Sequence, residues 1–174
     1  MTRSDRQLAE PHRPEAHQPD PLLDLVLTRI IDVPKEQVWS AWTVPEMLVK
    51  WFTPAPWTTV SCELDLRPGG IFRTVMRSPE GQEVTHLGCY LEVVRKERLV
   101  WTNALGPTFR PAATPTGIPA FTALIAFESH GRGTRYTALV MHKDSESRAR
   151  HEAMGFQDGW GKALDQLVAA AKRT

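Results

Sequence analysis

The feature that most constrains the fold is a long central stretch of strand-like runs separated by short turn-forming segments. Six such runs are recognisable, at residues 60–67, 72–77, 86–93, 99–103, 120–128 and 134–142. In the first three, apolar and polar residues alternate, which is typical of half-buried β-strands. Turn residues separate them at Pro68-Gly69-Gly70 and Pro79-Glu80-Gly81. Because consecutive strands joined by short turns pair antiparallel, this stretch predicts an antiparallel meander and not a Rossmann-type alternation.

Helical signals flank the meander on both sides. A strand predicted over residues 22–33 is followed by a helix with Pro34 in its first turn, and then by a second short helix over 47–52. After the meander, apolar residues recur every three or four positions, at Ala149, Ala153, Phe156, Trp160, Ala163, Leu167 and Ala171. We expect Asp144 or Ser145 to cap this segment, and a break near Gly155, since a helical glycine costs roughly 1 kcal/mol relative to alanine. The pattern predicts an α+β fold whose long C-terminal helix lies across the sheet.

The organisation predicted is one domain over residues 21–174, preceded by a disordered tail over 1–20. The tail interleaves charged residues with three prolines and lacks the apolar segment of a signal peptide. The uncharged run at 111–127 is broken by prolines and does not predict a membrane helix. A net charge of +1 argues against a nucleic-acid partner. Two cysteines cannot form a disulfide framework, so a reducing, cytoplasmic setting is expected.

Most signatures of catalysis are missing from the sequence. It contains no Cys-x-x-Cys pair, no His-Glu-x-x-His and no Gly-x-Ser-x-Gly. Gly131-Arg132-Gly133 lacks the third glycine of a dinucleotide loop, and Gly161-Lys162 lacks the upstream glycine of a phosphate-binding loop. We therefore expect neither a metal site nor a cofactor, and no pair of carboxylates or catalytic triad stands out.

The positive signal is the number of large apolar side chains predicted to lie between sheet and helix. Most of them should form an ordinary core, but a sheet curled around a helix can also accommodate an apolar ligand. The candidate ligand-binding residues are Trp51, Phe52, Trp57, Leu64, Phe72, Met76, Leu87, Cys89, Leu91, Trp101, Phe127, His142, Met154, Phe156 and Trp160.

Histidines and one long loop complete the set of candidates. His142, at the end of a strand, is the histidine that could face a pocket, although a histidine in such a place more often has a structural role. His86 shares its strand face with Glu92 and is expected to face solvent, and His151 is expected on the surface because it lies off the apolar stripe. The segment 104–119 holds four prolines and is long for a hairpin, which indicates either a lid or disorder.

The sequence also contains an ordered series of short motifs: Pro34-x-x-x-Val38-Trp39-x-Ala41-Trp42, Pro45-Glu46, Trp51-Phe52, Asp65-Leu66-Arg67-Pro68-Gly69-Gly70-x-Phe72-Arg73, Gly88-x-Tyr90-x-Glu92-Val93-Val94, Glu97-Arg98-Leu99-Val100-x-Thr102, Gly133-Thr134 and Gly159-Trp160-x-x-x-Leu164-x-x-Leu167. This series resembles one known family, the bacterial homologues of the heat-shock protein 90 ATPase activator within the START/Bet v 1-like (SRPBCC) superfamily. The resemblance covers roughly residues 22–172. It implies a helix-grip fold: a curved antiparallel sheet of six or seven strands around the C-terminal helix, two short helices after the first strand, and a cavity between sheet and helix.

Three functions are open at this point, since such a fold hosts many. The first is a cytoplasmic binding protein for an apolar or aromatic small molecule held between sheet and helix. The second is a cyclase- or hydrolase-like enzyme that uses His142 or Tyr90 in that cavity. The third is a module that interacts with a chaperone ATPase, or with a second copy of itself as a homodimer, through a face or edge of the sheet.

Overall fold

The computed structural model describes residues 17–113 and 117–174 of the chain. Its strands are β1 (Asp24–Ile31), β2 (Thr58–Leu64), β3 (Ile71–Arg77), β4 (Glu83–Val94), β5 (Arg98–Thr102), β6 (Leu105–Gly106), β7 (Arg110–Pro111), β8 (Phe121–His130) and β9 (Gly133–His142). Its helices are α1 (Lys35–Thr43), α2 (Pro45–Leu48), the 3-10 turn η1 (Pro107–Phe109), α3 (Ser145–Ala153) and α4 (Phe156–Ala171). Most of the predicted tail, residues 1–16, lies outside the described residues.

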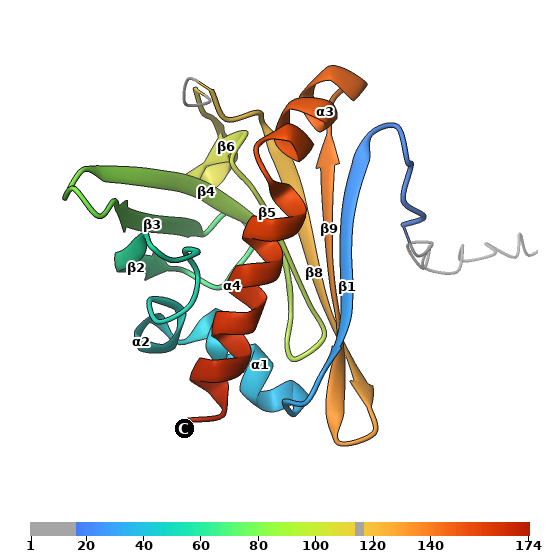
Figure 1. Ribbon diagram of the computed structural model, residues 1–174. Helices are drawn as coiled ribbons and strands as arrows, with labels where there is room; N and C mark the ends of the chain where they lie inside the picture. Colours follow the sequence, from blue (N-terminus) through green and yellow to red (C-terminus); the bar gives the residue numbers. More distant parts are fainter. Residues whose placement is uncertain (1–16, 114–116) are drawn as a thin grey trace, which may run out of the picture.

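Seven of these strands form one antiparallel sheet in the order β1-β9-β8-β5-β4-β3-β2, so the first and last strands of the described residues pair with each other. The predicted meander and the predicted number of strands are confirmed. Helix α4 lies across one face of the sheet, which we call the inner face, and α1 and α2 close the end of the molecule near the C-terminus of α4 (Figure 1). The molecule therefore has the helix-grip arrangement of an α+β fold.

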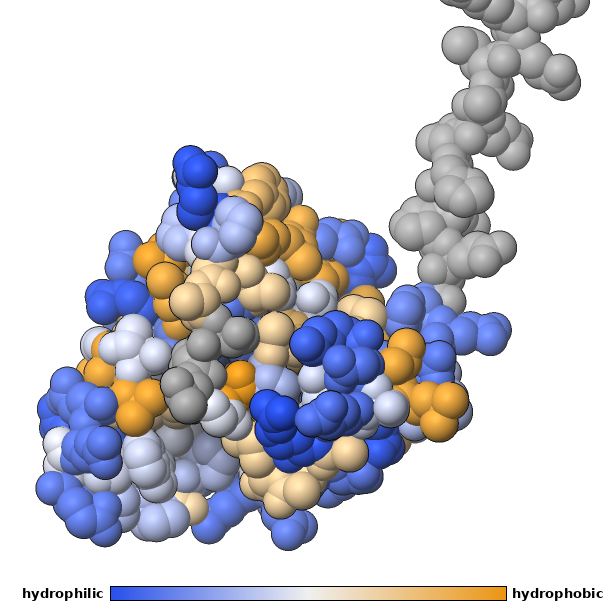
Figure 2. Space-filling view, turned by 90° about the horizontal axis from the view of Figure 1, so that it is seen from above, coloured by the Kyte–Doolittle hydropathy of each residue, from blue (hydrophilic) through white to orange (hydrophobic). Residues whose placement is uncertain are grey.

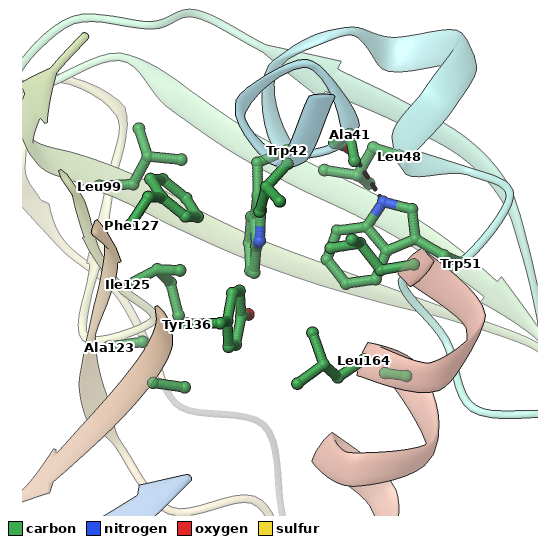
Figure 3. Close-up of a cluster of buried hydrophobic side chains, with 14 of the residues drawn as sticks. Ala41, Trp42, Leu48, Trp51, Leu99, Ala123, Ile125, Phe127, Tyr136 and Leu164 are labelled. Carbon is green, nitrogen blue, oxygen red and sulfur yellow. Dashed lines mark hydrogen bonds between the residues drawn. The ribbon is translucent and has the colours of Figure 1, made fainter. Parts of the chain in front are cut away.

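The core lies between the inner face and the helices. Trp42 of α1, Tyr136 of β9 and Leu164 of α4 are almost fully buried there and approach one another from three elements (Figure 3). The ring centroids of Trp42 and Trp51 lie 4.9 Å apart, and the Trp51 indole donates a hydrogen bond of 2.9 Å to the carbonyl oxygen of Ala41. Burial of aromatic side chains of this size removes about 150–250 Å² each from water, so this packing dominates the stability of the fold.

Helix α4 is fastened to both sides of the molecule by polar contacts. On the β1 side, the Arg29 guanidinium donates to the carbonyl oxygen of Gly161 and to the Asp165 carboxylate. On the other side, the Gln166 amide donates to the carbonyl oxygens of Trp51 and Thr53 at 2.9 and 2.8 Å and accepts from the Ala55 N–H at 2.9 Å. One residue thereby satisfies three backbone groups of the segment between α2 and β2.

The break predicted near Gly155 separates α3 from α4. Gly155 has φ 90°, a left-handed conformation that L-residues rarely adopt, and α4 starts at the next residue. Asp144 caps α3, as expected, by accepting a 2.7 Å hydrogen bond from the Ser147 N–H. Because the two helices are separate, a residue on α3 need not follow the apolar stripe of α4.

Two β-bulges determine which side chains face α4. The pairing of β2 with β3 shifts between Thr59 and Ser61, and the pairing of β4 with β5 shifts between Tyr90 and Glu92. Each bulge inserts one unpaired residue and reverses the facing of the residues beyond it. In β4 the reversal at Leu91 turns the first half of the strand so that its even-numbered residues face inward.

The first part of the long loop, residues 105–111, packs on the outward side of the sheet, whereas Ile118 near its end packs against the hydrophobic core. Gly106 lies against the side chain of Leu87, and the Thr108 N–H donates to the carbonyl oxygen of Gly69 at 2.8 Å. Since Leu87 pairs with Arg73 on the outward face, residues 105–111 support β4 from the outside of the sheet. Residues 114–116 of the same loop lie outside the described residues.

The surface shows no single large apolar region from above, where hydrophobic residues are interspersed with hydrophilic ones (Figure 2). Among the helices of the described residues, none is both long and apolar enough to cross a membrane.

Candidate ligand site

The candidate site lies on the inner face of β3, β4 and β5, around the ring of Phe72. This ring is fully buried, and its centroid lies 4.8 Å from Trp101, 5.3 Å from Tyr90 and 5.8 Å from His86. Directly opposite Phe72 in β4 is Gly88, where an added Cβ atom would come within 2.7 Å of the carbonyl oxygen of Thr102. The strand register thus gathers four rings from three strands at one place.

Four polar side chains of this region define what we call the β3–β5 polar cluster: Thr74, His86, Tyr90 and Trp101. Thr74 pairs directly with His86 across β3 and β4, and Tyr90 pairs with Trp101 across β4 and β5. The rings of His86 and Trp101 lie 5.3 Å apart. All four side chains therefore lie next to one another on the inner face.

The polar atoms of this cluster are buried and lack hydrogen-bond partners. The Thr74 hydroxyl, both His86 ring nitrogens, the Tyr90 hydroxyl and the Trp101 indole N–H have no partner within the described part of the chain. Only two other buried side-chain atoms there share this condition, the Arg29 Nε and the Trp42 Nε1. A buried polar group left unpaired costs about 1–3 kcal/mol, so four such residues together need an explanation.

Burial keeps the titratable members of the cluster uncharged. Desolvation lowers the pKa of His86 to about 4, so its imidazole is neutral at physiological pH, with one nitrogen donating and the other accepting. Burial also raises the pKa of Tyr90, reinforced by the nearby Cys62 thiol, so Tyr90 keeps its proton. At neutral pH the cluster offers hydrogen bonds without charge.

The inner face at the opposite end carries a second polar pair, His142 of β9 and His151 of α3. Nδ1 of His142 lies 2.9 Å from the carbonyl oxygen of Leu23 and must donate to it, because a carbonyl only accepts. Nε2 of His142 then accepts from Nδ1–H of His151 at 2.9 Å. Both ring orientations are fixed by these bonds, which tie α3 to the end of the sheet.

Both histidines of this pair are held neutral. Burial lowers the pKa of His142, against the opposing effects of the hydrogen bond to Leu23 and of the Asp24 carboxylate. Burial and the neighbouring His142 lower the pKa of His151 to about 4. Around them pack Phe121, whose ring lies 5.1 Å from His151, and Phe156 and Trp160 of α4. The structure gives His142 a structural role rather than leaving it available in an open pocket.

The structure brings together some of the residues singled out from the sequence and separates others. Phe72 and Trp101 belong to the candidate site, and Phe52 contacts Phe72 with ring centroids 5.5 Å apart. Leu64 and Met76 face inward on the flanking strands by their register. Trp51 and Phe127 are buried in the core, Phe156 and Trp160 pack near the histidine pair, and Trp57 is half-buried directly before β2.

Leu87 and Cys89 were expected on the inner face together with Leu91, and this placement is wrong. Leu87 pairs with Arg73 on the outward face, Cys89 shares that facing, and Leu91 is the bulged residue. For the same reason His86, expected to face solvent, points inward. The apolar alternation of residues 87–93 runs unbroken in the sequence, so nothing in it indicates the reversal.

Two further expectations fail at the junction of α3 and α4. Met154, expected to face the sheet, is 55% exposed, and His151, expected on the surface, is buried. Both follow from Gly155, which ends α3 and starts α4 at a new angle, so that one continuous helical stripe does not describe both helices.

A curved antiparallel sheet gripping a C-terminal helix, with polar groups buried between them, defines a helix-grip protein of the START/Bet v 1-like class. The chain belongs to the AHSA1 family, activator of Hsp90 ATPase homolog 1-like proteins, whose pattern matches residues 32–172. The family that the sequence motifs resembled is thereby confirmed.

Solved structures of similar proteins share this fold. Protein NE0264 from Nitrosomonas europaea is 47% identical with a TM-score of 0.83, and the alignment covers 88% of this chain and 97% of that one. Protein Ms6760 from Mycobacterium smegmatis is 25% identical with a TM-score of 0.67, covering 85% and 90%. An AHSA1-like protein from Aeromonas hydrophila, 20% identical with a TM-score of 0.65 over 87% and 93%, shares the fold. No curated protein matches the chain. Family and fold support a general ligand-binding or Hsp90 ATPase-activator-like module.

Proposed function

We propose that this protein binds a small apolar or aromatic molecule between the inner face of its sheet and α4, against the β3–β5 polar cluster. The observation that carries the proposal is the gathering of buried, unpartnered polar atoms among aromatic rings. A pocket that recognises a small molecule typically combines an apolar lining with a few convergent polar groups. The two unpaired cysteines support a reducing, cytoplasmic setting for this activity.

The energetics favour a bound molecule at this place. Each polar group that gains a partner no longer carries its cost of about 1–3 kcal/mol, and apolar contact adds about 25 cal/mol for each Å² removed from water. Phe52 and Met76 are only half-buried beside the cluster, so their side chains can move aside for a ligand. Phe72 and Trp101 then offer aromatic surfaces on which a planar molecule can pack.

Binding can be tested with the uncharged fluorescent probe N-phenyl-1-naphthylamine. We expect saturable binding, a rise in melting temperature, and a shift of the Trp101 indole N–H signal in two-dimensional NMR spectra, assigned with Trp101→Phe. The indole of Trp39, which packs against Phe127 away from the cluster, serves as the internal control. Phe72→Leu should weaken binding, whereas Leu87→Ala on the outward face should not. If neither the probe nor any lipid of a panel changed the NMR spectrum or the melting temperature of the protein, the proposal would be contradicted.

An enzymatic role can be narrowed to Tyr90. His142 lies on β9 and Tyr90 on β4, with β5 and β8 between them, so the two strands are about 14 Å apart at the usual spacing of neighbouring strands. The two residues therefore cannot act on one bond together. Tyr90 lies in the polar cluster with His86 and could donate a proton there, and turnover of a bound ester or ketone, lost in Tyr90→Phe, is the test.

A chaperone-binding role is favoured by a different observation, the outward apolar residues beside β6 and β7. Leu87 and Phe109 are 39% and 49% exposed. Gly106 contacts Leu87, and the Phe109 ring lies against Gly69. Stimulation of a chaperone ATPase that is lost in Phe109→Ser, but kept in Phe72→Leu, would support this role. No stimulation and no capture of the chaperone would exclude it.

A further inference from the structure

The hydrogen-bonding capacity of the β3–β5 polar cluster restricts the chemistry of its ligand. The Trp101 indole only donates, the protonated Tyr90 hydroxyl and the Thr74 hydroxyl can donate, and His86 offers one donor and one acceptor. All four side chains can thus donate a hydrogen bond, and Trp101 can only donate. The best partner is therefore a ligand that presents hydrogen-bond acceptors.

The charge around the cluster restricts the ligand further. The inner-facing residues of the adjoining rows are Cys62, Thr74 and His86, and then Leu64, Phe72 and Gly88, none of them charged at neutral pH. The charged residues of β2 to β5 face outward, where they form ion pairs. These pairs are Arg73 with Glu63, Arg77 with Glu83, and Arg98 with Glu92. A carboxylate or phosphate group would be buried here without a counter-charge, which is strongly unfavourable. Burial and the Glu46 carboxylate of α2 raise the pKa of the Cys62 thiol, so the charge at this edge of the cluster disfavours an anion further. An ammonium group would have to lose its hydration against the same uncharged lining.

The shape of the surrounding side chains restricts it once more. The Phe72 ring is stacked on Tyr90 and meets Trp101 and Phe52 edge to face. Rings arranged in this way pack well against a flat aromatic body in offset or edge-to-face contact. A pure hydrocarbon of that shape would satisfy the packing but would leave the donors of Tyr90 and Trp101 unpaired.

We infer that the ligand is an uncharged, planar aromatic molecule bearing a carbonyl-type oxygen, which accepts hydrogen bonds from Tyr90 and Trp101. The inference rests on the proposed binding function and adds the chemical class of the ligand. His86, with a neutral imidazole in contact with Trp101, can give or accept a further hydrogen bond according to its tautomer. The site therefore distinguishes ligands by a neutral acceptor, not by charge.

Three naphthalenes of similar shape separate these contributions. Naphthalene carries no polar group, 2-acetylnaphthalene a neutral carbonyl, and 2-naphthoate a carboxylate. Their affinities are measured with the full chain at pH 7.5 by displacement of N-phenyl-1-naphthylamine. We expect 2-acetylnaphthalene to bind at least about tenfold more tightly than either of the others. Naphthalene leaves the hydrogen-bond donors of the site unpaired, and the carboxylate of 2-naphthoate loses its hydration.

Two conservative variants assign the donors. Tyr90→Phe and Trp101→Phe should each weaken the binding of 2-acetylnaphthalene by about three- to tenfold and change the affinity for naphthalene by less than about twofold. Each substitution removes one hydrogen bond and keeps an aromatic ring. In the wild type, the Trp101 indole N–H signal should move further downfield with 2-acetylnaphthalene than with naphthalene. That signal reports the hydrogen bond without any variant.

The outcomes distinguish the two levels of the argument. Equal affinities for naphthalene and 2-acetylnaphthalene would overturn the inference about the acceptor and leave the proposed binding function standing. Tighter binding of 2-naphthoate would overturn the inference in favour of an anionic ligand. If the probe itself does not bind, the proposed function fails, and the inference fails with it.

Discussion

Two threonines on the inner face are equally buried and differ in their hydrogen bonds. Thr134 donates to the carbonyl oxygen of Val33 at 2.7 Å, whereas the Thr74 hydroxyl has no partner among the described residues. Thr134→Val should lower the free energy of unfolding by about 1–3 kcal/mol, because it leaves the Val33 carbonyl unpaired. Thr74→Val should cost less than about 0.5 kcal/mol in the ligand-free protein, and urea unfolding followed by tryptophan fluorescence measures both.

The comparison is matched because both changes replace a hydroxyl by a methyl group at a fully buried strand position. Equal losses of stability in the two variants would mean that the Thr74 hydroxyl is satisfied within the protein. The β3–β5 polar cluster would then have less capacity left for a ligand. 2-Acetylnaphthalene should stabilise both proteins against unfolding. If it stabilises Thr74→Val less than the wild type, the Thr74 hydroxyl is in contact with the ligand.

At the level of elements, two glycines at the junction of α3 and α4 have opposite effects. Gly155 has a left-handed backbone with nothing within 4 Å of an added Cβ atom, so Gly155→Ala should cost about 1 kcal/mol through the backbone alone. Gly159 lies inside α4, where a Cβ atom would just touch Pro54 at 4.0 Å, so Gly159→Ala should gain about 0.5–1 kcal/mol. Thermal and urea unfolding show whether each variant is more or less stable than the wild type. If both changes act in the same direction, the boundary between α3 and α4 at Gly155 is contradicted.

Most elements could be predicted from the sequence because their signals are local. The turns at Pro68-Gly69-Gly70 and Pro79-Glu80-Gly81, the cap at Asp144 and the break at Gly155 all act within a few residues. The site could be predicted only in part. Phe72 and Trp101 stand out in the sequence as large apolar residues, but the outward facing that it predicts for His86 is wrong, because the bulge at Leu91 depends on pairing with β5. When a partner strand sets the register, the alternation of apolar and polar residues within the strand itself does not reveal it.

For the molecule as a whole, three buried histidines make stability depend on pH. The pKa of His86 and that of His151 are lowered to about 4, and that of His142 is lowered too, in each case chiefly by burial. Between about pH 4 and the ordinary histidine pKa of about 6.5, the unfolded chain therefore binds more protons than the folded one. The free energy of unfolding should be level above about pH 6.5 and fall below it, by up to about 1.4 kcal/mol per pH unit for each independent histidine.

Variants identify which histidines are responsible. His86→Phe should reduce the slope between pH 6.5 and 5, and His151→Leu should reduce it as well, since it removes one proton site of the pair. Facing that pair are Asp24 of β1, Asp144 before α3 and Arg148 of α3, which contribute in both directions. His130→Gln, at an exposed position, is the control. If the free energy of unfolding changed with pH equally in the wild type, His86→Phe and His151→Leu, the buried histidines would not be responsible for the pH dependence.

The two-sided fastening of α4 by Arg29 and Gln166 has a consequence for the speed of ligand exchange. A helix attached at Gly161 to one flank and through Gln166 to the other cannot swing outward as a rigid rod without breaking several hydrogen bonds together. Rotation of a few side chains is faster than displacement of a helix, which takes microseconds to milliseconds. If Phe52 and Met76 move aside as proposed, a ligand enters without displacement of α4, and bound and free protein should interconvert without a slow step set by the backbone.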